Sequence, residues 1–267
     1  MQPQPSPLAH RVIGPPNGPT AFILHGILGQ ASNLHGLAKA LATRHPAWRF
    51  VLPDLRGHGG SAGGSPPHTV EACAADLAAL AAEVGAPRVV VGHSFGGKVA
   101  LVYARAHGAD DVWVLDAPPG AADPGQDHEV PRVIAATRAL AAPFASRDAV
   151  TAHFLDRGFG PGIAAWMTTN VARTAAGLVW KPDLDVVEAL LADYFRTDLW
   201  GFLADPGPVR VHVVRAGRSD RWDAATLQRL AASAVDVRVL PDAGHWLHVD
   251  DPEGLLALLD PTFAASA

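Results

Sequence analysis

Cysteine is almost absent from this chain of 267 residues, which contains only Cys73. A single cysteine excludes an internal disulfide, and its alanine-rich helical surroundings predict a small, buried apolar side chain. The chain also has no run of about 18 apolar residues, and residues 1–10 contain neither a basic nor an apolar region. We therefore expect a soluble, cytoplasmic protein without a membrane span.

Blocks of positive charge are missing as well, and the formal net charge is −5. Nothing therefore favours nucleic acid or an anionic membrane surface as a partner, and we expect a small-molecule substrate. No histidine pair has the HExxH spacing of a metalloprotease, so we expect neither a metal nor another cofactor. The oligomeric state is left open.

Short apolar strands alternate with helices along most of the sequence. Strands are predicted at residues 20–24, 50–52, 88–91, 112–116, 209–215 and 236–240, with an edge strand at 8–13. Strands separated by helices of about 10–15 residues predict an α/β fold with a mostly parallel, doubly wound sheet. The length suits one such domain over residues 1–267.

The alternation stops after Asp116. The segment from about 118 to 208 has a helical pattern without a convincing strand, and it contains half of the aromatic side chains: Phe144, Phe154, Phe159, Trp166, Trp180, Tyr194, Phe195, Trp200 and Phe202. We expect a helical cap, inserted above the sheet edge where open α/β sheets bind ligands. Some of its aromatic side chains then form the core of the cap, and Trp180 is expected to line the substrate pocket.

A nucleophile elbow is predicted at Gly92-His-Ser-Phe-Gly96, between the strand at 88–91 and a helix beginning near Lys98. This G-x-S-x-G pattern marks a sharp turn that exposes a serine hydroxyl at the top of a sheet. The glycines have a steric reason, because strand and helix approach too closely for a Cβ atom on either side. We therefore predict Ser94 as a nucleophile.

A serine nucleophile needs a base that is held by a third group. His245 follows a glycine in the loop after the last predicted strand, which brings it to the same sheet edge as Ser94. Two residues are candidates for the orienting acid. Asp220 fits the chain order Ser, Asp, His and is slightly favoured on that ground, whereas Asp116 ends the strand that follows the elbow helix.

Acyl transfer also requires N–H donors for an oxyanion. The amide of Phe95 should be one donor, because it directly follows the nucleophile. A second donor should come from the loop His25-Gly-Ile-Leu-Gly29, where Ile27 is the expected residue. We expect His25 and Trp246 to line the substrate pocket.

The motifs HGxxG, DxRGHGxS, GHSxGGK and a late GHW together resemble the α/β-hydrolase superfamily, and GHSFGGK and DAGHWLH are similar to YbfF-type esterases. The resemblance covers essentially the whole chain outside the cap. It implies a serine esterase or thioesterase that works through an acyl-enzyme intermediate. It also implies an acid at the position of Asp116, so that both aspartates remain candidates. Asp54, Arg56 and His58 match a loop with a structural role in the superfamily.

Other functions remain possible at this point. Residues 92–98 also fit G-x-x-x-x-G-K, the phosphate loop of nucleotide hydrolases, but Val99 stands where a metal-binding hydroxyl is required. A hydrolase fold that binds ligands without catalysis is a second alternative. C–C hydrolase, lactonase or perhydrolase chemistry can use a similar set of residues, and the fold does not decide among them.

Overall fold

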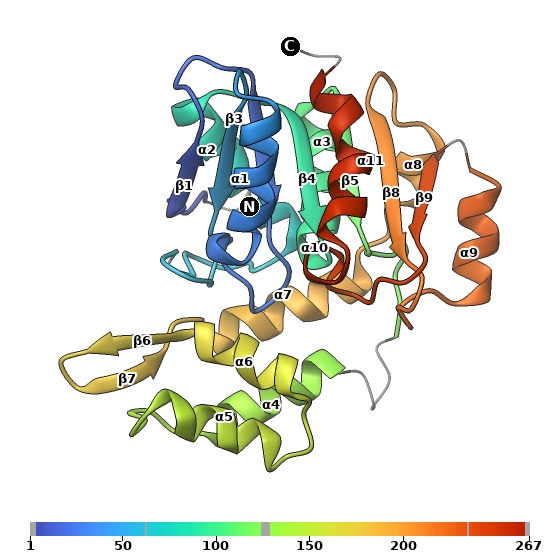
Figure 1. Ribbon diagram of the computed structural model, residues 1–267. Coiled ribbons are helices and arrows are strands. Elements are labelled where there is room, and N and C mark those ends of the chain that lie inside the picture. The colour runs from blue at the N-terminus through green and yellow to red at the C-terminus, as the bar shows by residue number, and fades with distance from the viewer. Residues whose placement is uncertain (1–3, 62, 124–128, 234, 265–267) are drawn as a thin grey trace.

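The computed structural model describes residues 4–61, 63–123, 129–233 and 235–264, and a sheet of seven strands forms its centre (Figure 1). The strand order is β1-β3-β2-β4-β5-β8-β9, and only the edge pair β1–β3 is antiparallel. The strands are β1 (His10–Ile13), β2 (Thr20–Leu24), β3 (Arg49–Pro53), β4 (Pro87–His93), β5 (Asp111–Leu115), β8 (Arg210–Ala216) and β9 (Asp236–Leu240). The predicted mostly parallel α/β sheet is thereby confirmed.

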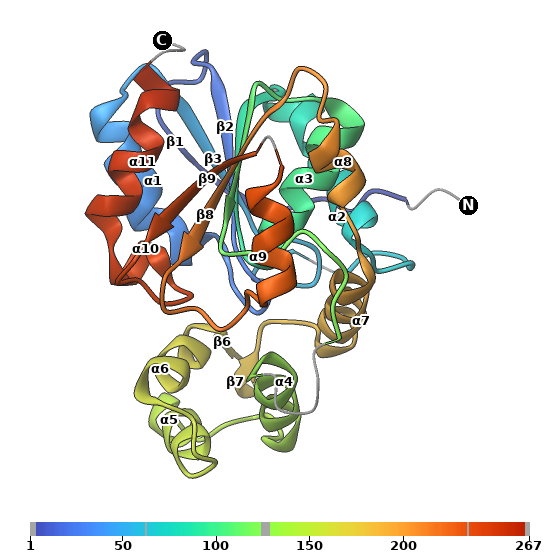
Figure 2. The same cartoon turned by 90° about the vertical axis from the view of Figure 1, so that its right-hand side faces the viewer.

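Helices cover both faces of the sheet (Figure 2). One face carries α1 (His35–Arg44) and α11 (Pro252–Ala264), and the other carries α2 (Val70–Val84) and α3 (Phe95–His107). The central strands read as continuous apolar runs because they are buried on both sides, as in Thr20–Leu24. Among the described residues, no helix is long and apolar enough to cross a membrane.

The strands β5 and β8 pair directly, so the chain between them leaves the sheet and returns to the neighbouring position. This segment contains α4 (Glu129–Ala139), α5 (Arg147–Leu155), α6 (Pro161–Thr169), β6 (Val171–Thr174), β7 (Gly177–Trp180), α7 (Leu184–Arg196) and α8 (Trp200–Ala204). Figures 1 and 2 show α4 to α6 below one end of the sheet, α7 between them and the sheet, and α8 beside the sheet. We call residues 118–208 the inserted segment.

The inserted segment contains a β-hairpin, contrary to the expectation of helices alone. The strands Val171–Thr174 and Gly177–Trp180 pair in antiparallel register around a short turn. Gly177 has φ +124°, a conformation that glycine adopts readily. Four-residue strands give too short a periodic pattern to stand out beside the helices.

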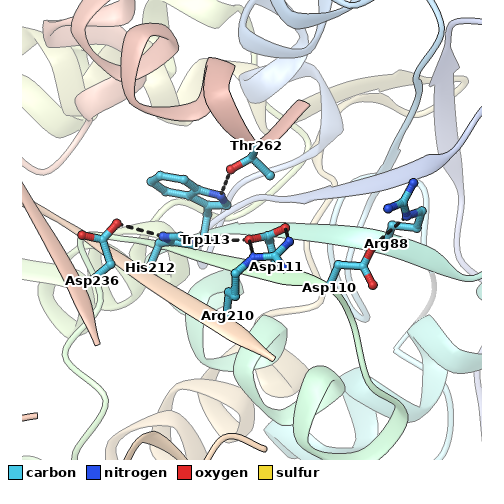
Figure 3. Close-up of polar contacts among 8 residues, drawn as sticks. All are labelled: Arg88, Asp110, Asp111, Trp113, Arg210, His212, Asp236 and Thr262. Atoms are coloured by element: carbon cyan, nitrogen blue, oxygen red, sulfur yellow. Dashed lines mark hydrogen bonds and ion pairs between the residues drawn. The ribbon is translucent and has the colours of Figure 1, made fainter. Parts of the chain in front are cut away.

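A polar network joins three parallel strands at their amino ends, away from the inserted segment (Figure 3). His212 on β8 bonds to Asp236 of β9 through Nδ1 at 2.9 Å and to Asp111 of β5 through Nε2 at 3.0 Å. Its ring stacks on Trp113 with 4.2 Å between the ring centroids. Arg210 adds two hydrogen bonds to Asp111. The network therefore links β5, β8 and β9 at the sheet end where their side chains approach solvent.

Candidate active site

Ser94 is the single residue between β4 and α3, with φ 52° and ψ −117°. The two glycines of the motif make this turn possible. A Cβ on Gly92 would lie 2.1 Å from the carbonyl oxygen of Gly96, and a Cβ on Gly96 would lie 2.6 Å from that of His25. The predicted elbow geometry is therefore present. A turn of one residue leaves no loop to enclose a phosphate, so the phosphate-loop alternative is wrong.

His245 lies in the loop after β9, and its ring is oriented by Asp116. The Nδ1 atom of His245 is 2.8 Å from Oδ2 of Asp116. Because a carboxylate accepts this bond, Nδ1 carries the hydrogen, and Nε2 is left with a lone pair on the opposite side of the ring. His245 and Ser94 line the same cavity, although no hydrogen bond joins the two side chains. The loop thus holds Nε2 of His245, which can accept a proton, at the same edge of the sheet as Ser94.

Asp116 is completely buried and accepts hydrogen bonds on both carboxylate oxygens. Oδ1 accepts from the indole of Trp222 at 2.7 Å and from the amide of Ala216 at 3.0 Å. Burial raises the pKa of Asp116. The hydrogen bonds that it accepts from His245, Ser219 and Trp222, together with the charge of His245, lower this pKa by more, so the net shift is downward. The carboxylate is therefore ionised at neutral pH beside His245.

Asp220 does not take this position. The slight preference for Asp220 from chain order is therefore wrong, and Asp116 is the aspartate that bonds to His245. The side chain of Asp220 is exposed, whereas its neighbours Ser219 and Trp222 donate to Asp116. The loop after β8 thus supplies donors to an acid that comes from the end of β5. Chain order placed the right loop at the site but selected the wrong side chain from it.

Burial lowers the pKa of His245 to about 4, with the hydrogen bond that His245 donates to Asp116 opposing the shift and the charge of Arg221 adding to it. A neutral imidazole is the form that can accept a proton. The resting site is therefore in the form that a general base requires at neutral pH.

The loop after β2, which contains Ile27, lies next to Ser94, and both residues line the same cavity. Gly26 adjoins the serine so closely that a Cβ on it would lie 3.3 Å from Cβ of Ser94. The carbonyl of Gly26 accepts from Nδ1 of His25 at 2.7 Å and from the amide of Gly29 at 2.9 Å. These two bonds fix the peptide that carries the N–H of Ile27. Within the described part of the chain, no acceptor is bonded to that N–H group.

His25 was expected in the pocket wall, and it lines the cavity. Its ring is only 1% exposed, however, and its two nitrogens are engaged with the backbone. Nε2 accepts from the amide of Leu55 at 2.9 Å while Nδ1 donates to Gly26. Burial lowers the pKa of His25 to about 4, so the ring is neutral and can make both bonds. The geometry gives His25 a positioning task in the loop.

Phe95 is the first residue of α3, so no carbonyl within the helix can accept from its amide. This N–H lies at the positive end of the helix dipole, directly after Ser94. The phenyl ring is 1% exposed and lies 6.0 Å from the ring of Tyr194, measured between centroids. Phe95 thus directs its side chain into the core and leaves its amide at the turn.

Backbone strain is concentrated at this edge of the sheet. Among the described residues other than glycine, only Leu28, Ser94 and Asp116 have positive φ angles, of 56°, 52° and 49°. One belongs to the loop that carries Ile27, one is the elbow serine and one bonds to His245. Such conformations persist only where the surrounding structure enforces them, and they cluster at functional sites.

A cavity of about 400 Å³ opens over Ser94 and His245. One wall comes from a single face of α6, with Gly162, Ala165, Trp166 and Thr169 at helical spacing. Trp246 lines the cavity as predicted, and its ring is 5.6 Å from that of Trp166. The inserted segment therefore forms part of the cavity that contains the serine.

Trp180 was also predicted to line the pocket, and that prediction is wrong. Its indole donates to the carbonyl of Leu140 at 3.1 Å, and its ring packs 4.7 Å from that of Phe144. Trp180 therefore belongs to the core of the inserted segment. Trp180 is the last residue of the strand β7, a position that a helical interpretation of that stretch does not predict.

Several residues that line the cavity are not predicted by any sequence pattern: Glu129, Arg221, His93 and His248. His93 precedes the nucleophile, and adjacency to the motif was the one available signal for it. Arg221 and Glu129 lie in segments whose approach to Ser94 depends on the tertiary fold. Over the residues that the structure describes, no group of three His, Cys, Asp or Glu side chains is arranged to hold a metal ion.

The other loop residues of the resembling motifs are structural. Both carboxylate oxygens of Asp76 are bonded to Arg56, which is completely buried. Nε2 of His58 accepts from the amide of Leu28 at 2.9 Å. Asp54 accepts from the amides of Ala31 and Gly60. These bonds hold the loop after β3 against the loop that carries Ile27, as expected.

A parallel sheet of this strand order, with a strained serine after β4 and a histidine after its last strand, is the architecture of the α/β hydrolases. The sequence pattern of the alpha/beta hydrolase family matches residues 21–258, and the chain belongs to this family. It is 29% identical over 265 residues to an sn-1-specific diacylglycerol lipase of Mus musculus, covering 95% of this chain and 84% of the relative.

Solved structures agree in fold. A marine microorganism esterase superposes with a TM-score of 0.83 at 22% identity, covering 96% of this chain and 99% of that chain. An E-2-(acetamidomethylene)succinate hydrolase superposes with a TM-score of 0.77 at 23% identity, covering 95% of this chain and 94% of that one. These likenesses establish the α/β-hydrolase fold.

Proposed function

We propose that the protein is a serine hydrolase that cleaves a carboxylic ester or an acyl thioester through an acyl-enzyme intermediate. The observation that carries the proposal is the 2.8 Å bond between His245 and Asp116 beside a cavity that also contains Ser94. The names of relatives, which include a diacylglycerol lipase and a lipase, support an ester as the substrate.

In the first step, Oγ of Ser94 attacks the acyl carbon while Nε2 of His245 takes the hydroxyl proton. Asp116 holds the ring in the required tautomer and stabilises the imidazolium that forms. The amides of Ile27 and Phe95 donate to the oxyanion of the tetrahedral intermediate. His245 then returns the proton to the leaving alcohol or thiol. Water, activated by the same nitrogen, hydrolyses the acyl-enzyme.

The inserted segment acts as a cap in this mechanism. Its helix α6 supplies a wall of small, apolar and aromatic side chains opposite the serine, which suits an acyl chain. Closure of such a wall over the reacting carbonyl also strengthens the hydrogen bonds to the oxyanion by excluding water.

The test is hydrolysis of p-nitrophenyl acyl esters by the wild type and by Ser94→Ala. We expect a loss of about 10³-fold or more in kcat, because the hydroxyl is the reacting atom. Ser32→Ala is the matched control, since Ser32 is exposed on the helical turn before α1. A fluorophosphonate should label the wild type and the control but not Ser94→Ala. Retention of most activity by Ser94→Ala would overturn the proposed function.

A further inference from the structure

Asn170 joins the inserted segment to the loop that carries Ile27. It follows α6 directly and is only 1% exposed. Its Nδ2 atom donates to the carbonyl oxygen of Leu28 at 2.7 Å, a contact between residues 142 positions apart in the sequence. The cap helix and the loop after β2 are therefore joined by a buried hydrogen bond.

Leu28 is the strained residue of that loop, with φ 56°. Its N–H donates to Nε2 of His58 on the sheet side, and its carbonyl accepts from Nδ2 of Asn170 on the cap side. The left-handed conformation is thus held from two directions by two different parts of the molecule. Such a conformation is unfavourable for a residue with a side chain and persists only where the surrounding structure enforces it.

Lys181 and Gln30 reinforce the same junction. Nζ of Lys181 donates to Oε1 of Gln30 and to the carbonyl of Thr169, both at 2.9 Å. Nε2 of Gln30 donates to the carbonyl of Thr169, also at 2.9 Å. Three side chains therefore bind the end of α6 to residues 28–30.

The junction is adjacent to Ile27. A loop that loses the partner of the Leu28 carbonyl must turn that buried carbonyl toward another donor, because an unpaired buried carbonyl is unfavourable. Rotation at Leu28 changes the course of the chain next to the amide of Ile27. A displacement of about 1 Å at a reacting geometry can reduce a rate by about 100-fold.

We propose that Asn170 is a positioning residue for the oxyanion hole, so that docking of the cap through Asn170 sets the amide of Ile27. The inference rests on the proposed function, since it assigns a task within that mechanism. The cap then acts on the chemical step as well as on substrate binding. When the cap is not docked, Leu28 keeps its hydrogen bond to His58 but loses the one from Asn170.

The experiment measures kcat per active site, with the site concentration from fluorophosphonate titration, in Asn170→Asp. Aspartate has the same shape, but its carboxylate cannot donate to the Leu28 carbonyl. We expect kcat to fall by about 10-fold or more with little change in KM, because the lost interaction acts in the transition state. Affinity for a trifluoromethyl ketone, which forms a tetrahedral adduct with the serine, should fall in parallel.

The matched control is Asn17→Asp, the same substitution at an exposed turn. Normal kcat per titrated site and normal ketone affinity in Asn170→Asp would overturn the inference. If Asn170→Asp does not fold, Lys181→Met decides by the same two measurements, with smaller losses expected because Lys181 acts through Gln30 and Thr169. An active Ser94→Ala would instead overturn the proposed function, which keeps the two failures distinct.

Discussion

His93 donates its Nε2 hydrogen to the backbone carbonyl of His245 across 2.8 Å. The residue before the proposed nucleophile thereby holds the loop of the proposed base. Burial lowers the pKa of His93 to about 3, and the charge of His245 contributes in the same direction. The ring is neutral at physiological pH, and the carbonyl acceptor requires the hydrogen on Nε2.

Replacement of His93 should therefore misplace His245 without removing a reacting group. We expect His93→Ala to lower kcat by about 10-fold to 100-fold, because loss of the bond releases the loop by a fraction of an ångström. The measurement is kcat per titrated site, with His35→Ala at an exposed helix start as the control. An unchanged kcat in His93→Ala would show that the loop holds His245 by its own turns.

The two candidate acids should separate in parallel substitutions. Asp116→Asn keeps the shape but disturbs the tautomer of His245, and we expect kcat to fall by about 10³–10⁴-fold. Asp220→Asn should change kcat by less than about 3-fold, because exposed substitutions away from such contacts have small effects. The measurement is ester hydrolysis at saturating substrate. A large loss in Asp220→Asn and a small one in Asp116→Asn would reverse the assignment.

The pH dependence of kcat/KM should reflect the low pKa of His245. Only the neutral ring accepts a proton, so activity falls as the pH drops through the pKa of this group. Burial lowers that pKa from 6.5 to about 4, so we expect the acid limb well below pH 6.5. Measurement over a series of buffers of constant ionic strength locates the limb. A midpoint at or above pH 6.5 would contradict the effect of burial.

Lys98 joins the elbow helix to the start of the inserted segment and to the end of α7. Its Nζ donates to the carbonyls of Gly120, Tyr194 and Thr197 at 2.7, 2.8 and 2.9 Å, and it lies 4.3 Å from the centroid of the Tyr194 ring. Gly120 lies where the chain enters the segment, and Thr197 lies where α7 ends. Burial lowers the pKa of Lys98 to about 8, with the charges of Asp198 and Asp193 opposing the shift.

Lys98→Met preserves the aliphatic stem and removes the three donors. The three carbonyls then lose their shared partner, and we expect a loss of about 1–3 kcal/mol in the free energy of unfolding. We also expect kcat/KM to fall more for long acyl esters than for acetyl esters, because long chains contact the cap wall. Lys39→Met, at an exposed position of α1, is the control. Equal losses at all acyl lengths would limit Lys98 to a role in stability.

His212 should make stability depend on pH at the opposite end of the sheet. Burial opposes protonation, but the hydrogen bonds that His212 donates to Asp111 and Asp236 and the charges of these carboxylates raise its pKa above 6.5. The stabilisation is then fully present below about pH 6.5, the value in the unfolded chain, and is lost as the pH rises through the folded value. His212→Gln should lower the free energy of unfolding by about 1–3 kcal/mol at pH 6 and by less at pH 9.

Denaturant unfolding of the wild type and His212→Gln at several pH values between 5 and 9 measures this difference. Below that range, protonation of Asp111 and Asp236, whose pKa values are lowered in the folded protein, removes their contribution. A difference that grows toward high pH would show that the neutral ring is the stabilising form.

Local patterns predicted the elements that place Ser94 and His245. The run before Gly92 is a strand because it is short and β-branched, and the glycines two residues before and after Ser94 permit its strained turn. The proposed acid Asp116 is harder to select from the sequence, since Asp220 is also expected at this edge. The choice depends on which carboxylate faces His245 across β5 and β8, and side-chain direction over that distance is a tertiary property.

The inserted segment was the least predictable part of the chain. Its helical pattern predicts helices, but the hairpin at Val171 to Trp180 is too short to be recognised from the sequence. The contact of Asn170 with Leu28 joins distant parts of the sequence, and no local pattern marks an asparagine for such a bond. The residues that connect the inserted segment to the loop after β2 are therefore recognised only in the folded chain.

The inserted segment begins and ends at two strands that are hydrogen-bonded neighbours. An exchange of this segment with that of another hydrolase would therefore leave the sheet register unchanged, with Ser94 and His245 both outside the exchanged residues. Such a chimera would inherit the acyl preference of the donor. The exchanged segment would also need a side-chain amide that donates to the Leu28 carbonyl. The compatibility of the segment with the rest of the chain would therefore depend on this hydrogen bond as well as on loop length.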